Sequence, residues 1–195
     1  MEFAEVMRKR RMIRSYEDRA LPEAVVERIV RNALRAPSAG FSQGWAFLVL
    51  TDPGDRARFW TAAGAPKTGV GSGMVRAPLV VVALSHKAAY LDRYAADDKG
   101  WSDRSEAHWP VPYWDVDASF AALLMHLTAI ELGLGTCFAG ITVDRIPAFK
   151  EEFGVPDAYH PVGYVTAGYP AADTASPSLR RGHRPLAEVV HRGGW

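Results

Sequence analysis

The chain has 195 residues, of which 48 % are hydrophobic and 23 % are charged, and its formal net charge at pH 7 is +1. These values suit one globular domain over residues 1–195, and the small charge argues against a general role in binding nucleic acid or a membrane surface. Because Cys137 is the only cysteine, and because neither an apolar signal core nor a run of about 20 apolar residues is present, we expect a soluble cytoplasmic protein without internal disulfides.

The first part of the chain combines amphipathic and fully apolar segments. Pro22 suits the first turn of a helix, and the apolar residues that follow it form a single stripe. Asp52 is a candidate helix cap, and Leu79 to Leu84 is wholly apolar, as in a strand buried on both faces. We expect helices over residues 2–9, 22–35, 52–63 and 88–94, strands over 46–51 and 79–84, and a glycine-rich loop over 65–76.

The second part begins with an irregular stretch, residues 97–113, which is polar and aromatic. A loop of this length in a compact domain is usually a functional lid or mobile. Residues 116–134 then predict a helix that is apolar nearly all round, which we expect to be buried on every side and shared with a partner subunit. Strands are expected over 136–139 and 161–168, with a helix between them that Asp144 caps and that ends at Phe153.

A turn of small and polar residues, 36–45, separates the second predicted helix from the first predicted strand. Pro37 ends the helix, and Gly40 and Gly44 allow a tight turn and close approach of a ligand. Ser38 and Gln43 offer donors and acceptors suited to the edge of a planar heterocycle. The alternative is a polar connection between a helix and a strand without a ligand.

Arginines gather near both ends of the chain. The guanidinium group suits a phosphate, and two distant groups that meet on one phosphate could anchor a cofactor. The alternative is that these side chains are solvated surface charges. The early group is Arg10, Arg11 and Arg14, and the late group is Arg180, Arg181 and Arg184.

Four segments, in order, resemble motifs of the nitroreductase family of flavoproteins. Residues 10–16 resemble R-R-S-x-R-x-F, residues 36–45 resemble A-P-S-x-x-N-S-Q-P-W, and residues 133–140 resemble G-L-G-T-C-W-x-G. Residues 181–190 resemble the basic closing segment of the family. The resemblance implies an α+β fold, with a central, mostly antiparallel sheet flanked by helices and a long buried central helix. It also implies a homodimer that binds FMN.

The resemblance also implies which residues bind the cofactor. Arg10, Arg11 and Arg184 match family residues that bind the FMN phosphate, and Arg14 matches a basic position near the flavin. The turn matches a segment that reaches the flavin across the dimer interface, and the backbone at residues 138–140 passes near flavin N5, so that no catalytic side chain is expected. The full set of expected cofactor residues is Arg10, Arg11, Met12, Arg14, Pro37, Ser38, Ala39, Phe41, Gln43, Phe138, Ala139, Gly140, Arg181 and Arg184.

Two of these positions, and Gly44 of the turn, depart from the family pattern. Met12 replaces a serine, which removes a donor from the phosphate site, so either the affinity for FMN is lower or His183 or Arg181 compensates. Phe41 replaces an asparagine, and the loss of that amide makes the pocket more apolar. Gly44 replaces a proline.

The function that the resemblance implies is FMN-dependent transfer of two electrons from NAD(P)H to a nitroaromatic, a quinone or a similar small acceptor, by a ping-pong mechanism. One alternative is a flavin-consuming or dehalogenating enzyme, and another is a non-catalytic protein that binds or sequesters flavin. The expected substrate pocket is formed by Phe41, Trp109, Tyr113 and Trp114, three of them from a lid over residues 97–114. The six histidines lack paired metal-ligand spacing, so no metal site is expected.

Overall fold

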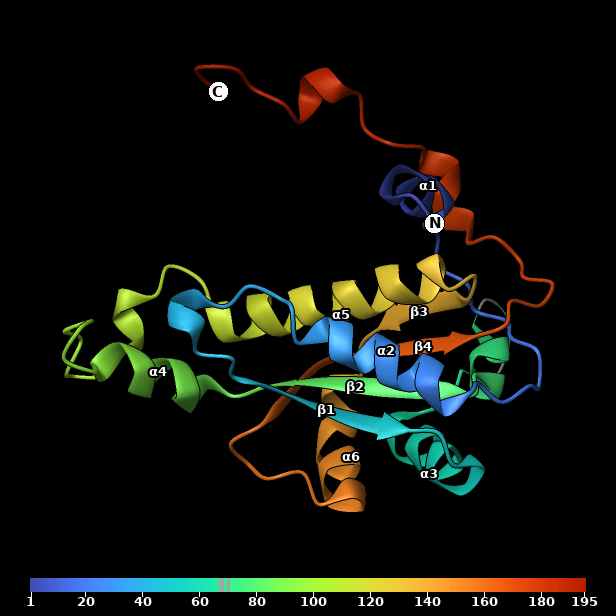
Figure 1. The fold of residues 1–195 in the computed structure, drawn as a ribbon, viewed down its shortest axis with the longest axis horizontal. Coiled ribbons are helices and arrows are strands. Elements are labelled where there is room, and N and C mark those ends of the chain that lie inside the picture. Colours follow the sequence, from blue (N-terminus) through green and yellow to red (C-terminus); the bar gives the residue numbers. More distant parts are fainter. Residues whose placement is uncertain (67–68, 70) are drawn as a thin grey trace.

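The structure, a computed structural model, describes residues 1–66, 69 and 71–195. At its centre lies a four-stranded antiparallel sheet with the strand order β1-β2-β4-β3 (Figure 1). The strands are β1 (Trp45–Leu50), β2 (Leu79–Ser85), β3 (Gly135–Ala139) and β4 (His160–Gly168). The predicted α+β fold with an antiparallel sheet is therefore confirmed.

Helices pack on both faces of this sheet (Figure 1). One apolar core lies between the sheet, α3 and α6, and the other lies between the sheet, α2 and α5. Val80 and Val82 of β2 face the first core, whereas Leu79 and Val81 face the second, so this strand is buried on both faces as predicted. The helices are α1 (Phe3–Lys9), α2 (Glu23–Ala33), α3 (Pro53–Ala63), α4 (Lys87–Ala95), α5 (Tyr113–Glu131) and α6 (Ile146–Phe153).

Two sequence predictions about helix ends have clear outcomes. The cap of α3 is confirmed, because Asp52 accepts hydrogen bonds from the backbone N–H groups of Gly54 and Asp55, at 2.7 and 3.2 Å. The predicted cap of α6 is wrong, because Asp144 lies inside a 3-10 turn, Val143–Arg145, and α6 begins after it without a side-chain cap. Because the 3-10 turn separates Asp144 from the start of α6, its carboxylate is not in position to accept hydrogen bonds from the backbone N–H groups of the first turn of α6.

The start of the central helix differs from its prediction. α5 begins at Tyr113, three residues before the expected start, so Tyr113 and Trp114 belong to its first turn and not to an irregular lid. The helix packs against the sheet and α2 as a long buried element, whereas Phe120 and Leu123 are 42 % and 47 % exposed in the single chain. That a partner subunit shares this helix stays a prediction.

The loop predicted over residues 65–76 is only partly described. Residues 67, 68 and 70 lie outside the described residues, and Ser72–Arg76 forms a 3-10 helix. The stretch between α4 and α5 is irregular as expected, apart from a 3-10 turn, Glu106–His108.

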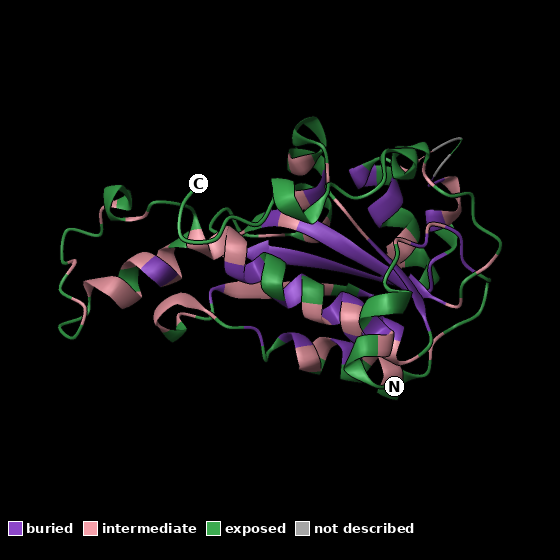
Figure 2. Cartoon of the chain, turned by 90° about the horizontal axis from the view of Figure 1, so that it is seen from above, coloured by how far each residue is buried: buried purple, intermediate pink, exposed green. Residues whose placement is uncertain are grey.

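The two ends of the chain lie in different environments. Residues 10–17 run beside the sheet, where the N–H of Ile13 donates to the carbonyl of Thr136 at 2.9 Å and the hydroxyl of Tyr16 donates to the carbonyl of Ile13 at 2.6 Å. In contrast, every residue of 177–195 is exposed, and this segment leads away from the sheet (Figures 1 and 2). The N-terminal segment is thus fixed on the sheet, whereas the C-terminal segment presents its side chains to the surroundings.

Candidate functional site

A cavity of about 160 Å³ lies where the N-terminal segment, α5 and β3 meet. Arg10 and Met12 come from the N-terminal segment, Phe138 comes from β3, and α5 supplies the opposite wall with Ser119, Ala122, Leu123 and His126. Three residues that the sequence assigns to the cofactor therefore line one cavity, although Phe138 lies more than 120 positions after Arg10 and Met12. We call it the Arg10 cavity.

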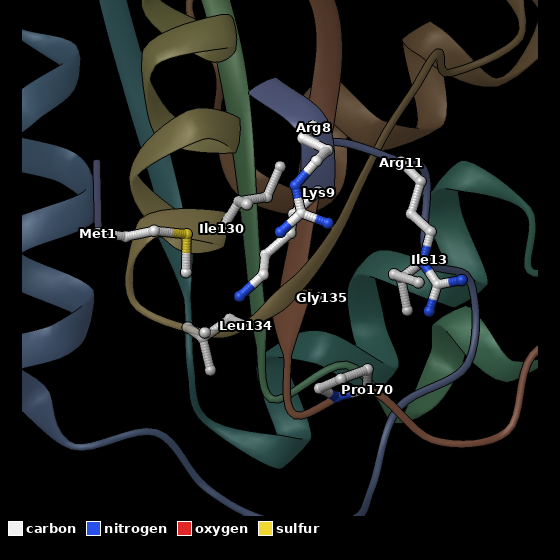
Figure 3. Close-up of a pocket in the computed structure, with 10 residues that line it drawn as sticks. Met1, Arg8, Lys9, Arg11, Ile13, Ile130, Leu134, Gly135 and Pro170 are labelled. Atoms are coloured by element: carbon white, nitrogen blue, oxygen red, sulfur yellow. The ribbon is translucent and has the colours of Figure 1, made fainter. Parts of the chain in front are cut away.

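The structure places Arg11 elsewhere. Side chains of an extended segment alternate between two sides, and Arg11 and Ile13 line a second pocket of about 400 Å³ together with Arg8 and Lys9 (Figure 3). Among the described residues, no carboxylate forms an ion pair with the side chains of Arg10, Arg11 or Arg14. Both sides of the segment thus carry guanidinium groups that could pair with a ligand anion.

Met12 and the end of β3 are in direct contact. The N–H of Phe138 donates to the sulfur of Met12 at 3.5 Å, so the thioether lies next to the β3 backbone. Gly163 on β4 makes room for the ring of Phe138, because a Cβ atom at that position would collide with it.

Ala139 is half-buried and Gly140 is exposed. Open space surrounds the position of a Cβ at Gly140, so a ligand could approach the backbone there.

His126 of α5 is the buried histidine of this cavity. Its side chain is 2 % exposed, and its Nδ1 lies 3.3 Å from the hydroxyl of Thr136. Its Nε2 is buried and has no partner among the described residues. Burial, aided by the charge of Arg10, lowers the pKa of His126 to about 4, so the imidazole is neutral at pH 7.

The turn at 36–45 is held by side chains that the sequence analysis did not identify. Asp117 of α5 is buried, and one of its oxygens accepts hydrogen bonds from the N–H of Ala39 at 2.8 Å and the hydroxyl of Tyr90 at 2.9 Å. Arg93 donates to the carbonyl of Gly40 at 3.0 Å. The family proline is replaced by Gly44 for a steric reason, since a Cβ there would lie 2.5 Å from the ring of Tyr90.

The tip of the turn is strained and exposed. Phe41 and Gln43 have φ angles of 56° and 50°, a left-handed conformation that is uncommon outside glycine. Such strain is concentrated at functional sites. Phe41 is 75 % exposed. Within the turn, Ser38 accepts a hydrogen bond from the N–H of Gln43 at 3.0 Å.

The turn and the Arg10 cavity are separate within one chain. None of Pro37, Ser38, Ala39, Phe41 and Gln43 lines the cavity. The late arginines are also apart from it, because Arg181 and Arg184 lie in the exposed C-terminal segment, where Arg184 pairs with Glu188 at 3.3 Å. One chain therefore brings together Arg10, Met12 and Phe138 but not the other two groups of expected cofactor residues.

The expected substrate residues form an aromatic cluster over α4. Trp109 packs at its centre, and its ring centroid lies 4.5 Å from that of Tyr94 and 5.8 Å from that of Tyr113. Trp114 joins the same cluster at 6.0 Å from Trp109. Trp109 is half-buried: one side of its ring packs on Tyr90 and Tyr94 of α4, and the rest is accessible to solvent. Phe41 is not among the ring contacts of the described residues.

Among the described residues, no group of three or more potential metal-ligating side chains is close enough to hold an ion. None of the described helices is long and apolar enough to cross a membrane. Cys137 is buried, which raises the pKa of its thiol, so the thiolate needed for reactivity is disfavoured.

Comparison with known proteins shows the family of the chain. The nitroreductase family matches residues 7–169. An Archaeoglobus fulgidus protein with the provisional name NADH dehydrogenase/NAD(P)H nitroreductase is 29 % identical over 188 residues, which are 95 % of this chain and 94 % of that protein. An NADPH-dependent oxidoreductase of Staphylococcus aureus is 24 % identical, over 97 % of this chain and 72 % of its own. A nitroreductase family protein from Clostridium difficile has the same fold, with a TM-score of 0.75, 24 % identity and full coverage of both chains. The chain therefore belongs to the nitroreductase family.

Proposed function

We propose that this member of the nitroreductase family is an FMN-dependent oxidoreductase that passes two electrons from NAD(P)H to a small acceptor such as a nitroaromatic or a quinone. FMN supplies the redox chemistry when it is bound, and the chain binds it, orients it and shields it from water. The names of the relatives support the use of a nicotinamide donor.

The Arg10 cavity is the observation that carries this proposal. A guanidinium group without a carboxylate partner suits the phosphate of FMN, and a cavity of about 160 Å³ has room for that end of the cofactor. The buried, unpaired Nε2 of His126 marks the cavity as built for a polar ligand atom, because such atoms in folded proteins normally have a partner. The residues present therefore fit the cofactor.

We further propose that the site is completed in a homodimer. Phe120 and Leu123 form an exposed apolar strip on α5 beside the Arg10 cavity, and such a strip is typical of an interface. The turn at 36–45 lies outside the cavity of its own chain, so the turn of a partner could cover it. The exposed residues 177–195, with Arg181 and Arg184, could reach the partner in the same way.

Ping-pong kinetics follow from the same arrangement. The open space over Gly140 is the approach to the β3 backbone, and the donor and the acceptor would occupy it in turn. If the turn of a partner covers the site, the aromatic ring of Phe41 in that turn would select among flat acceptors by stacking.

The experiment compares binding of FMN to the wild-type protein, Arg10→Ala and Arg11→Ala, by the quenching of flavin fluorescence. We expect Arg10→Ala to weaken binding by about 1.5–3 kcal/mol, the contribution of a charge-assisted hydrogen bond. Arg11→Ala is the matched control, because its side chain lines the other pocket. Equal affinities of all three proteins for FMN would refute the assignment of the phosphate to the Arg10 cavity.

Steady-state assays with NADH or NADPH and a panel of nitroaromatics and quinones then test the reaction. Turnover with parallel double-reciprocal plots is expected. Binding of FMN without turnover with any donor would instead favour a protein that sequesters flavin.

A further inference from the structure

We propose that His126 is an additional cofactor-binding residue, whose Nε2–H donates a hydrogen bond to an oxygen at the phosphate end of the cofactor in the Arg10 cavity. This inference rests on the proposed function, since it takes FMN as the occupant. It goes beyond the resemblance to the family, none of whose motifs includes this position.

The first support is the tautomer of the imidazole, that is, which ring nitrogen carries the proton. The hydroxyl of Thr136 lies 3.3 Å from Nδ1, and its described contacts include no other acceptor, so it donates to Nδ1. A neutral imidazole that accepts at Nδ1 carries its proton on Nε2. The buried nitrogen without a partner is therefore an N–H donor.

The second support is the position of that donor. His126 and Arg10 both line the Arg10 cavity, one from α5 and the other from the N-terminal segment. The charge of Arg10 also acts on the imidazole and helps to lower its pKa, which requires the two groups to be near one another. Two residues with N–H donors that line one small cavity are complementary to an oxygen anion with several lone pairs.

The third support is the cost of the alternative. A buried donor without a partner destabilises a protein, and the chain tolerates it here within an otherwise apolar wall. If the donor served the fold, it would have a protein partner. A ligand oxygen satisfies the donor only when the cofactor is bound, so the donor contributes to cofactor binding and not to the stability of the fold.

The test measures the dissociation constants of FMN and riboflavin for the wild type, His126→Leu and His126→Gln. Leucine removes the donor and keeps an apolar wall, whereas the amide of glutamine can return an N–H to the position of Nε2. We expect His126→Leu to weaken FMN binding by about 10- to 150-fold, the effect of one hydrogen bond to a charged group, and His126→Gln to restore most of it. Riboflavin lacks the phosphate, so its affinity should be the same for all three proteins.

Urea unfolding of the FMN-free proteins provides the second measurement. His126→Leu removes an unpaired buried donor but leaves the hydroxyl of Thr136 without its acceptor, so its stability should be close to that of the wild type. A less stable His126→Leu protein with unchanged FMN affinity would show that the histidine serves the fold, and it would overturn the inference. Equal losses for riboflavin and FMN would overturn the assignment to the phosphate end.

The outcomes separate this inference from the proposed function. If Arg10→Ala weakens FMN binding and His126→Leu does not, the inference fails and the proposed function stands. If the wild type does not bind FMN, both fail.

Discussion

The hydroxyl of Tyr90 is expected to stabilise the turn at 36–45 through Asp117, and Tyr90→Phe removes that hydroxyl alone. The ring of Tyr90 is fully buried, and its hydroxyl donates to Asp117 at 2.9 Å. Burial, together with Asp117, raises the pKa of Tyr90, so the phenol remains a donor throughout the pH range of the folded protein. Phenylalanine keeps the edge-to-face contacts of the ring with Trp109 and Trp114.

The magnitude follows from the charge on the acceptor. A hydrogen bond to a charged group contributes about 1.5–3 kcal/mol, and Asp117 keeps its second donor, the N–H of Ala39, in the variant. We therefore expect Tyr90→Phe to lower the free energy of unfolding by about 2 kcal/mol. The effect should be local, so the m value, which is the slope of the unfolding free energy against urea concentration, should not change.

Urea unfolding measures this loss, with Tyr94→Phe as the matched control. Tyr94 belongs to the same aromatic cluster, and no hydrogen bond of its hydroxyl is present among the described residues. A double-mutant cycle of Tyr90→Phe and Asp117→Ala isolates the interaction between the two side chains and should give a coupling energy of about 1 kcal/mol or more. If Tyr90→Phe is no less stable than Tyr94→Phe, the hydroxyl does not hold the turn and the reasoning is refuted.

Three further predictions concern other parts of the site. Phe41→Gly should raise the free energy of unfolding by about 1 kcal/mol in urea, because glycine adopts the φ of 56° without strain and an exposed ring loses little packing; a loss of stability would contradict this. Between pH 6.5 and pH 4 the unfolded chain takes up a proton at His126 that the folded chain does not, so acidification should cost up to about 3 kcal/mol of stability over this window. His126→Leu should flatten the dependence, and an unchanged profile of unfolding against pH would exclude the histidine as its source. Trp109→Ala should lower the free energy of unfolding by about 3 kcal/mol, because the ring packs among Tyr94, Tyr113 and Trp114. It should also lower kcat/KM for all acceptors to the same extent. A change in kcat/KM for bulky acceptors alone, at constant stability, would instead establish Trp109 as part of a lid.

The sequence predicts those elements whose signals are local. The apolar run of β2 and the Asp52 cap of α3 each depend on residues that are neighbours in the chain, and both are confirmed. The sequence places the start of α5 too late because residues 97–113 are polar and aromatic, whereas the helix already begins at Tyr113, after Pro112, a position that proline tolerates. Apolar composition predicts that α5 packs on something, but which side is covered depends on the tertiary structure.

The site shows the same division between local and long-range information. The resemblance to the family located Arg10, Met12 and Phe138, which line one cavity. The separation of Arg10 from Arg11 could have been read from the two-residue period of an extended segment. In contrast, Asp117 is 78 residues from Ala39 and 27 from Tyr90, and no local pattern links them.

α5 connects the two parts of the proposed site. Its first turns carry Asp117, which fixes the turn at 36–45, and its middle carries His126, which lines the Arg10 cavity. Phe120 and Leu123 lie between these two residues along the helix and are exposed. If two copies pair through Phe120 and Leu123, each α5 would hold the turn of its own chain near the cavity of the other. Dimerisation and flavin binding would then depend on the same helix, so a polar substitution such as Leu123→Glu should weaken both together. Light scattering and FMN titration of that variant test this coupling, and loss of the dimer without loss of FMN affinity would show that each chain binds its cofactor alone.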